Sequence, residues 1–139
     1  MLSKKTKYGL KALSYLAKQE INVPVLISEI SESENISKKF LESILLTLKK
    51  NGLLASKKGK GGGYYLLKKP TEIKIATIIR LLEGPIAMLP CVSLNYYEKC
   101  DDCISEEKCS LNVLMTEVRD STLKILENKT LADIIADKN

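Results

Sequence analysis

Residues 53–67, LLASKKGKGGGYYLL, constrain the fold of this chain more than any other stretch. Two short apolar runs flank a loop of lysines and glycines, and a glycine-containing link between runs of strand length predicts a β-hairpin. The lysines at its tip are Lys57, Lys58 and Lys60. Four glycines leave the tip open to close approach by a surface, and these are Gly59, Gly61, Gly62 and Gly63. Such a tip is suited to an anion, either a nucleic-acid backbone or a single phosphate.

Three helices are predicted before the hairpin from the spacing of apolar residues. The first covers residues 6–19, and the second, shorter helix covers residues 27–33 after a break at 22–24. Ser37 is a suitable N-cap for the third helix, which is expected to end near Asn51 and Gly52. The turn at Glu34 and Asn35 between the second and third helices is tight. This order predicts a helix-turn-helix followed by a wing.

The polar side of the third helix is the candidate surface for reading DNA, because a major groove about 12 Å wide admits one helix by its N-terminal residues. The candidates on this helix are Ser37, Lys38, Lys39, Glu42 and Ser43. The candidates on the wing are Lys58, Gly59, Lys60, Gly62, Gly63 and Tyr64. A solvated surface helix that binds nothing would have the same pattern. The combination of the third helix with the hairpin is what favours double-stranded DNA as the partner.

The charge distribution supports the same interpretation. Residues 1–70 contain 14 lysines and 5 acidic residues, giving +9, whereas residues 71–139 contain 8 basic and 12 acidic residues, giving −4. The basic half is therefore expected to meet a polyanion. The chain has no apolar run of membrane-spanning length and no signal peptide at its start, so we expect a cytoplasmic protein without a membrane partner.

Catalysis is not expected. The sequence contains no histidine, so no mechanism can rest on imidazole. The glycine loop differs from a phosphate-binding Walker loop because Gly61 follows Lys60 where serine or threonine is needed. A small enzyme, or an interaction module that does not bind DNA, is a distant alternative to the DNA-binding interpretation.

Two further helical regions follow the hairpin. A fourth helix is predicted over 71–84, and from Ser110 onward apolar residues recur in alternating steps of four and three, as in a coiled-coil seam. The seam residues are Leu111, Met115, Val118, Thr122 and Ile125. Such a helix is expected to form a homodimer, although packing against its own domain would give the same pattern. Thr130 and Asp133 fit a capping box for a last short helix.

The predicted fold is therefore mainly α with a small β-hairpin. Residues 1–84 are expected to form a winged helix-turn-helix domain with its wing at about 53–67. Residues 85–109 form a cysteine-containing loop, and residues 110–139 form the dimerisation helix and a C-terminal helix.

The cysteines are spaced as Cys91-x8-Cys100-x2-Cys103-x5-Cys109. Clustered cysteines in a cytosolic chain favour a metal or redox site over structural disulfides. Four thiolates would satisfy an iron-sulfur cluster or a tetrahedral zinc ion, whereas direct thiol chemistry and inert cysteines are the alternatives. The nearby carboxylates oppose thiolate formation and an anionic cluster, and these are Glu98, Asp101, Asp102, Glu106 and Glu107.

The chain resembles the bacterial winged-helix regulators that include IscR, NsrR and CymR. The resemblance is most specific in the wing, at Ser56, Lys58-Gly59, Gly62-Gly63-Tyr64 and Leu66. It extends to Tyr8-Gly9-Leu10, Phe40-Leu41-Glu42, Glu83-Gly84-Pro85 and Thr130-Leu131-Ala132-Asp133. It implies a homodimer paired through the long helix, binding a roughly palindromic operator, in which the cysteines favour a 2Fe-2S cluster.

The chain also departs from that family. Lys58 stands where the wing usually has arginine, which removes bidentate hydrogen bonding. The Cys103-x5-Cys109 step matches the last two cysteines of cluster-holding members, but Cys100 is an additional thiol. Asn112 and Lys7 occupy the positions where members of the family have a histidine or an aspartate as the fourth ligand.

Overall fold

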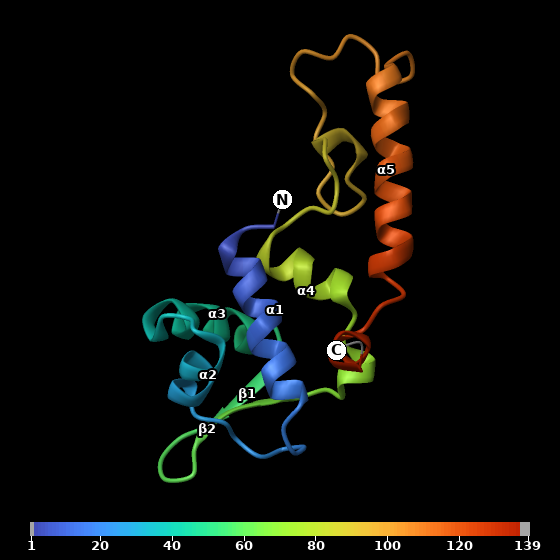
Figure 1. Ribbon diagram of the computed structural model, residues 1–139. Helices are drawn as coiled ribbons and strands as arrows, with labels where there is room; N and C mark the ends of the chain where they lie inside the picture. Colours follow the sequence, from blue (N-terminus) through green and yellow to red (C-terminus); the bar gives the residue numbers. More distant parts are fainter. Residues whose placement is uncertain (1, 137–139) are drawn as a thin grey trace.

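The computed structural model describes residues 2–136, which form a mainly helical body, one β-hairpin and one helix that stands apart (Figure 1). The helices are α1 (Lys4–Ala17), α2 (Ile27–Glu34), α3 (Lys38–Lys50), α4 (Ile75–Leu82), α5 (Ser110–Leu126) and α6 (Leu131–Ala136). The strands are β1 (Leu54–Lys57) and β2 (Gly63–Leu66), and two short 3-10 turns are η1 (Pro70–Glu72) and η2 (Pro90–Val92). The predicted fold class is confirmed.

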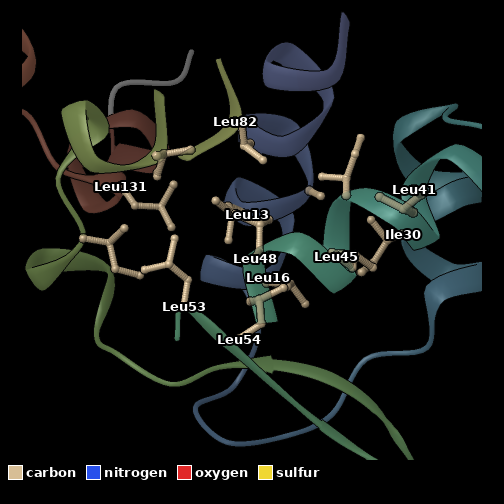
Figure 2. Close-up of a cluster of buried hydrophobic side chains, with 14 of the residues drawn as sticks. Leu13, Leu16, Ile30, Leu41, Leu45, Leu48, Leu53, Leu54, Leu82 and Leu131 are labelled. Carbon is tan, nitrogen blue, oxygen red and sulfur yellow. The ribbon is translucent and has the colours of Figure 1, made fainter. Parts of the chain in front are cut away.

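The core surrounds α1, with α2 and α3 on one side and α4 and α6 on the other (Figure 1). Leu13 of α1, Leu48 of α3 and Leu131 of α6 are fully buried. Figure 2 shows these leucines in one continuous cluster with Leu54 of β1 and Leu82 of α4. Each buried leucine contributes about 1.5–3 kcal/mol relative to an exposed one. The last short helix is therefore part of the core of the helical body.

Gly9 allows α1 and α4 to approach closely. A Cβ added at this glycine would overlap Cδ1 of Leu82 and would also press on Ile44. The glycine therefore has a packing role in the middle of α1, where the sequence alone marks it only as a weak helix former. Helix α1 also begins at Lys4 rather than at residue 6, because the Ser3 side chain caps it by accepting a hydrogen bond from the Thr6 N–H at 3.3 Å. It ends at Ala17 rather than at residue 19.

The predicted fourth helix over 71–84 is wrong in its first part. Residues 70–72 form the turn η1, and α4 itself covers only Ile75–Leu82. Between them, Ile73 and Lys74 are extended, because the chain pairs there with the segment before α6. The Ile75 N–H donates to the Lys129 carbonyl at 3.0 Å, and the Leu131 N–H donates to the Ile73 carbonyl at 2.9 Å.

The hairpin is antiparallel, with Leu54 opposite Leu66 and Lys57 opposite Gly63. An isolated bridge adds Val25 to its edge, because Val25 and Tyr64 exchange two backbone hydrogen bonds of 2.8 Å. A Cβ at Gly63 would overlap the Val25 carbonyl, and the φ of Gly63 is +142°. The base of the wing is thereby fixed to the segment that leads into α2.

Helix α5 stands upright beside the body and carries the cysteine loop at its far end (Figure 1). Its described side chains include no buried residue. Its C-terminal end is attached to α4 by the Arg80–Glu127 ion pair at 2.8 Å. The capping box that follows is confirmed, because the Thr130 N–H donates to Asp133 at 2.8 Å and the Asp133 N–H donates to the Thr130 hydroxyl at 3.4 Å.

The predicted C-terminal unit extends to residue 139, and its residues 137–139 lie outside the described part of the chain. Within residues 2–136, no helix combines the length and apolar character needed to cross a membrane.

Candidate nucleic-acid interface and cysteine segment

The N-terminal end of α3 is exposed, and its cap is made by the chain itself. The Ser37 hydroxyl accepts a hydrogen bond from the Phe40 N–H at 3.2 Å, so this candidate reading residue also starts the helix. The exposed side chains beside it include Lys38, Lys39 and Glu42. The Ser43 hydroxyl donates to the Phe40 carbonyl at 2.8 Å, which holds this side chain against its own helix. The oppositely placed apolar stripe of α3 lies in the core.

Contacts from α1 fix the direction of α3. The rings of Tyr8 and Phe40 meet edge to face with centroids 5.7 Å apart. The ammonium of Lys11 lies 6.0 Å from the Tyr8 ring centroid and donates to the Glu34 carbonyl at 3.2 Å, at the C-terminal end of α2. Asn35 then adopts the left-handed conformation with φ of 54°, which turns the chain into α3. The two helices of the helix-turn-helix are thus held rigidly on α1.

The tip of the wing exposes lysine side chains beside glycines that have open space around them. Lys58 and Lys60 are exposed, and a Cβ at Gly59 or Gly61 would meet nothing within 4 Å. These glycines have φ of 86° and 75°, so the tight turn requires them.

The other two glycines of the wing serve the hairpin itself. Gly62 is buried, and a Cβ there would overlap the Lys57 carbonyl, whereas Gly63 makes room for Val25 as described above. Tyr64 is half-buried and packs against the core. Of the predicted wing residues, Lys58, Gly59 and Lys60 therefore remain as the open surface.

Among the residues that the structure describes, the exposed lysines of α3 and the wing have no acidic partner. The salt bridges among residues 2–136 all involve α4, α5 or the residue before α4. In Figure 1 the wing loop and α3 lie on the same side of α1, away from α5. A lysine without a carboxylate partner is available to neutralise a phosphate.

The cysteine segment brings its thiols to the N-terminal end of α5. The side-chain amide of Asn112 donates to Cys91 Sγ at 3.4 Å, and the backbone N–H of the same residue donates to Cys109 Sγ at 3.4 Å. Cys109 is thereby the N-cap of α5. A hydrogen bond to Cys91 is the main cause that raises the pKa of the Cys100 thiol to about 11, and burial and the nearby sulfurs add to it. All four cysteines are free and half-buried.

These thiols have the chemistry of metal ligands. Four sulfurs suit iron-sulfur or zinc binding. Within residues 2–136, however, no three side chains of cysteine, histidine, aspartate or glutamate are grouped to hold a metal ion. Cys91 instead accepts a hydrogen bond from the Asn112 side chain. In the sequence, Asn112 is notable only because it stands where relatives have a histidine, whereas in the fold it contacts two cysteines.

Two further contacts hold the loop. The Tyr97 hydroxyl donates to Glu106 at 2.5 Å, and this bond raises the pKa of Tyr97 to about 12. Arg119 of α5 donates to the Val92 carbonyl at 2.8 Å, and the Val92 side chain is only 2% exposed. The segment around Cys91 is thus pinned to α5, while the Tyr97–Glu106 bond closes the part of the loop that carries Cys100 and Cys103.

Comparison with known proteins agrees with this architecture. Residues 2–137 match the Rrf2 family, which is described as iron-dependent transcriptional regulators. An rrf2-like HTH-type transcriptional regulator of Rhodobacter capsulatus is 42% identical, over 100% of this chain and 95% of that protein. The structure of CymR, the global cysteine regulator of B. subtilis, has a TM-score of 0.81 at 31% identity and covers 100% of this chain and 98% of that one.

T. potens IscR has a TM-score of 0.75 at 32% identity, with 99% and 87% of the two chains covered. The resemblance to CymR and IscR inferred from the wing and helix motifs is confirmed by these matches. The relatives are transcriptional regulators rather than enzymes, which also agrees with the expectation that the chain has no catalytic role. This chain belongs to the Rrf2 family of transcriptional regulators.

Proposed function

We propose that the chain is a homodimeric, sequence-specific DNA-binding regulator whose cysteine segment responds to redox or iron-sulfur status. The observation that carries the DNA-binding part is the exposed wing tip, where Lys58 and Lys60 stand without acidic partners beside open glycines. By binding across a promoter the protein would repress transcription, and we expect it to act in the cytoplasm.

In the proposed complex, α3 enters the major groove and the wing lies on the neighbouring backbone. Lys38, Lys39 and Glu42 are exposed at the end of α3 that leads into the groove, where base edges are within reach. Ser37 and Ser43 lie on the same end, with hydroxyls that remain able to contact phosphate or base. The wing lysines neutralise phosphates, which adds affinity but little sequence information.

The α3 part of the proposal is tested by replacing Glu42 with glutamine and selecting bound genomic fragments. We expect a changed operator preference, because a carboxylate accepts hydrogen bonds from a base edge whereas an amide both donates and accepts. The matched control is Glu32→Gln, an equally exposed glutamate on α2. Equal losses on every operator, or the same change in the control, would contradict a reading role for Glu42.

The proposed homodimer is formed by α5. Leu111 and Ile125 at the two ends of its seam are 50% and 60% exposed, and Met115 and Val118 between them are not fully covered. A helix whose apolar seam is covered only in part by the described residues of its own chain is suited to pair with a second copy. Two-fold symmetry would then set the α3 helices about 34 Å apart, one turn of DNA.

Sedimentation of the full chain tests the dimer. Leu111→Asp together with Ile125→Asp is expected to give a monomer, because each change buries a carboxylate in the seam. A matched pair, Glu117→Ala and Ser121→Ala, changes exposed polar positions of the same helix and should leave the dimer intact. A double aspartate variant that still sediments as a dimer would remove α5 from the interface.

The signal-sensing part rests on the cysteine segment and on the family description as iron-dependent. A 2Fe-2S cluster is the candidate cofactor, zinc is the alternative, and the four cysteines are the candidate donors. Anaerobic purification followed by iron, sulfide and zinc analysis tests both. A colourless preparation without iron or sulfide would exclude the cluster, and the absence of zinc from the same preparation would leave the thiols themselves as the sensor.

A further inference from the structure

Leu46 is the most exposed apolar side chain of α3. It is 45% exposed, whereas the leucines and the isoleucine on the opposite side of the helix are fully buried. Within residues 2–136 it belongs neither to the hydrophobic core nor to the apolar side chains packed against that core. The other exposed residues of α3 are charged or carry a hydroxyl, and they are Lys38, Lys39, Glu42, Ser43, Lys49 and Lys50. A single exposed leucine is common on protein surfaces, so its place on the helix decides what it can do.

Helical geometry puts Leu46 on the face of α3 that is proposed to enter the major groove. Successive residues of an α-helix turn by about 100°, so Leu46 lies about 40° around the axis from Glu42 and about 60° from Ser43. Viewed along the axis, it stands between these two candidate reading residues, and it lies about 6 Å farther along the helix than Glu42. Side chains lean toward the N-terminal end of a helix, which brings the leucine methyl groups back toward Glu42.

The hydroxyl groups beside Leu46 are bonded to the helix itself. The Ser43 hydroxyl donates to the Phe40 carbonyl at 2.8 Å, and the Thr47 hydroxyl donates to the Ser43 carbonyl at 3.1 Å. These donors are therefore used within the chain. What the middle of α3 offers to a partner is an acceptor, the Glu42 carboxylate, next to an apolar surface, the Leu46 methyl groups.

The major groove contains an apolar group that suits this surface, the C5-methyl of thymine. We propose that Leu46 is a specificity-determining residue that contacts a thymine methyl one or two base pairs from the base read by Glu42. The interval follows from the geometry, because base pairs are about 3.4 Å apart and the axial offset of about 6 Å is shortened by the lean of the side chain. The contact removes apolar surface from water, which a lysine or a hydroxyl in its place would not do. The inference rests on the proposed function, since it requires α3 in the major groove.

Replacement of thymine by deoxyuridine in the operator tests the contact, because it removes only the C5-methyl group and keeps the base pair. The operator is selected from genomic fragments with the full chain, and each thymine of one half-site is replaced in turn. We expect one thymine at which the replacement weakens wild-type binding about fourfold, the effect of one methyl group returned to water. This thymine should lie within two base pairs of the position at which Glu42→Gln changes the preference. Replacement of the other thymines should have little effect.

Matched variants assign the contact to Leu46. The Leu46→Ala variant should bind the operator and its deoxyuridine form equally well, because the methyl group has lost its partner on the protein. Its melting temperature should stay close to that of the wild type, since the side chain lies outside the core. Leu94→Ala is the control, because it makes the same change at a leucine of the cysteine loop that is 63% exposed. This control should keep the fourfold effect of the replacement.

The outcomes separate this inference from the proposed function. Wild-type protein that distinguishes operators but is indifferent to every deoxyuridine replacement would overturn only the inference, and this result does not depend on how any variant folds. A Leu46→Ala variant that keeps the full effect of the replacement would also overturn it, because the methyl contact would then belong to another residue. Wild-type protein that binds no DNA would refute the proposed function and, with it, the role of Leu46.

Discussion

Removing the two lysines at the wing tip should reduce the salt dependence of DNA binding. Lys58 and Lys60 are exposed and have no acidic partner within residues 2–136, so their replacement by alanine should change phosphate contacts and leave the fold intact. We therefore expect weaker binding to all DNA sequences, with an unchanged melting temperature.

The expected change in salt dependence follows from the number of lysine charges that are removed. In a dimer with two wings, the double substitution removes up to four phosphate contacts, and each contributes about 0.9 to the slope of log K against log salt. The slope should therefore become less negative by about 3.6. Over a fourfold rise in salt concentration, the wild type should lose about 150-fold more affinity than the variant.

Fluorescence anisotropy with a labelled duplex at several salt concentrations measures both quantities. Lys129→Ala is the control for loss of a lysine charge, because it removes one charge from an exposed position next to α6, away from the wing. An unchanged slope in the wing variant would show that the tip does not touch the backbone. A loss confined to one operator would instead assign the lysines to base reading.

Three further predictions concern stability. Gly9→Ala should destabilise the fold by roughly 1–3 kcal/mol in urea unfolding, because the new methyl overlaps Leu82, and shortening Leu82 to alanine in the same chain should make the glycine change less costly. Hydrogen bonds from the Ser3 N–H and the Thr6 hydroxyl hold the pKa of Glu83 below its ordinary 4.5. The stabilising effect of the Glu83 carboxylate should be complete above pH 4.5 and should be lost as pH falls through the lower pKa of the folded state. The melting temperatures of wild type and Glu83→Gln should therefore converge in acid. A difference in melting temperature that stays constant with pH would contradict this role of Glu83. Thr130→Ala should cost about 1 kcal/mol by removing the cap of α6, whereas Thr116→Ala on α5 should cost less.

Local sequence patterns were sufficient to predict a helix or a hairpin that buries a single apolar stripe. The spacing of Leu41, Ile44 and Leu48 predicted α3, and the Lys-Gly loop predicted the hairpin. The error over 71–84 has a different origin. Ile73 fits a helical stripe, but it is held in an extended conformation by backbone pairing with residues more than fifty positions later. Pairing between distant segments leaves no periodic signal in either of them.

The candidate site was likewise predictable only in part. Exposed lysines can be recognised from charge alone, but the separate roles of the glycines in the wing depend on neighbours in space. Gly63 faces Val25, and Gly62 faces a carbonyl across its own turn. Cysteine spacing indicated reactive thiols. The contacts of Asn112, whose side chain donates to Cys91 and whose backbone N–H donates to Cys109, depend on how the loop folds against α5.

The attachment of α5 at its C-terminal end makes this helix a lever. Its 17 residues span about 25 Å from the Arg80–Glu127 pair to the thiols. A displacement of about 2 Å at the sulfur end therefore corresponds to a tilt of only about 5° at the base. Carried across a half-site distance of about 34 Å, the same 5° shifts a reading helix by about 3 Å, close to the rise of one base pair. In the proposed dimer on DNA, a displacement of about 2 Å at the cysteine end of α5 would thus be matched in scale to a shift of one base pair in register.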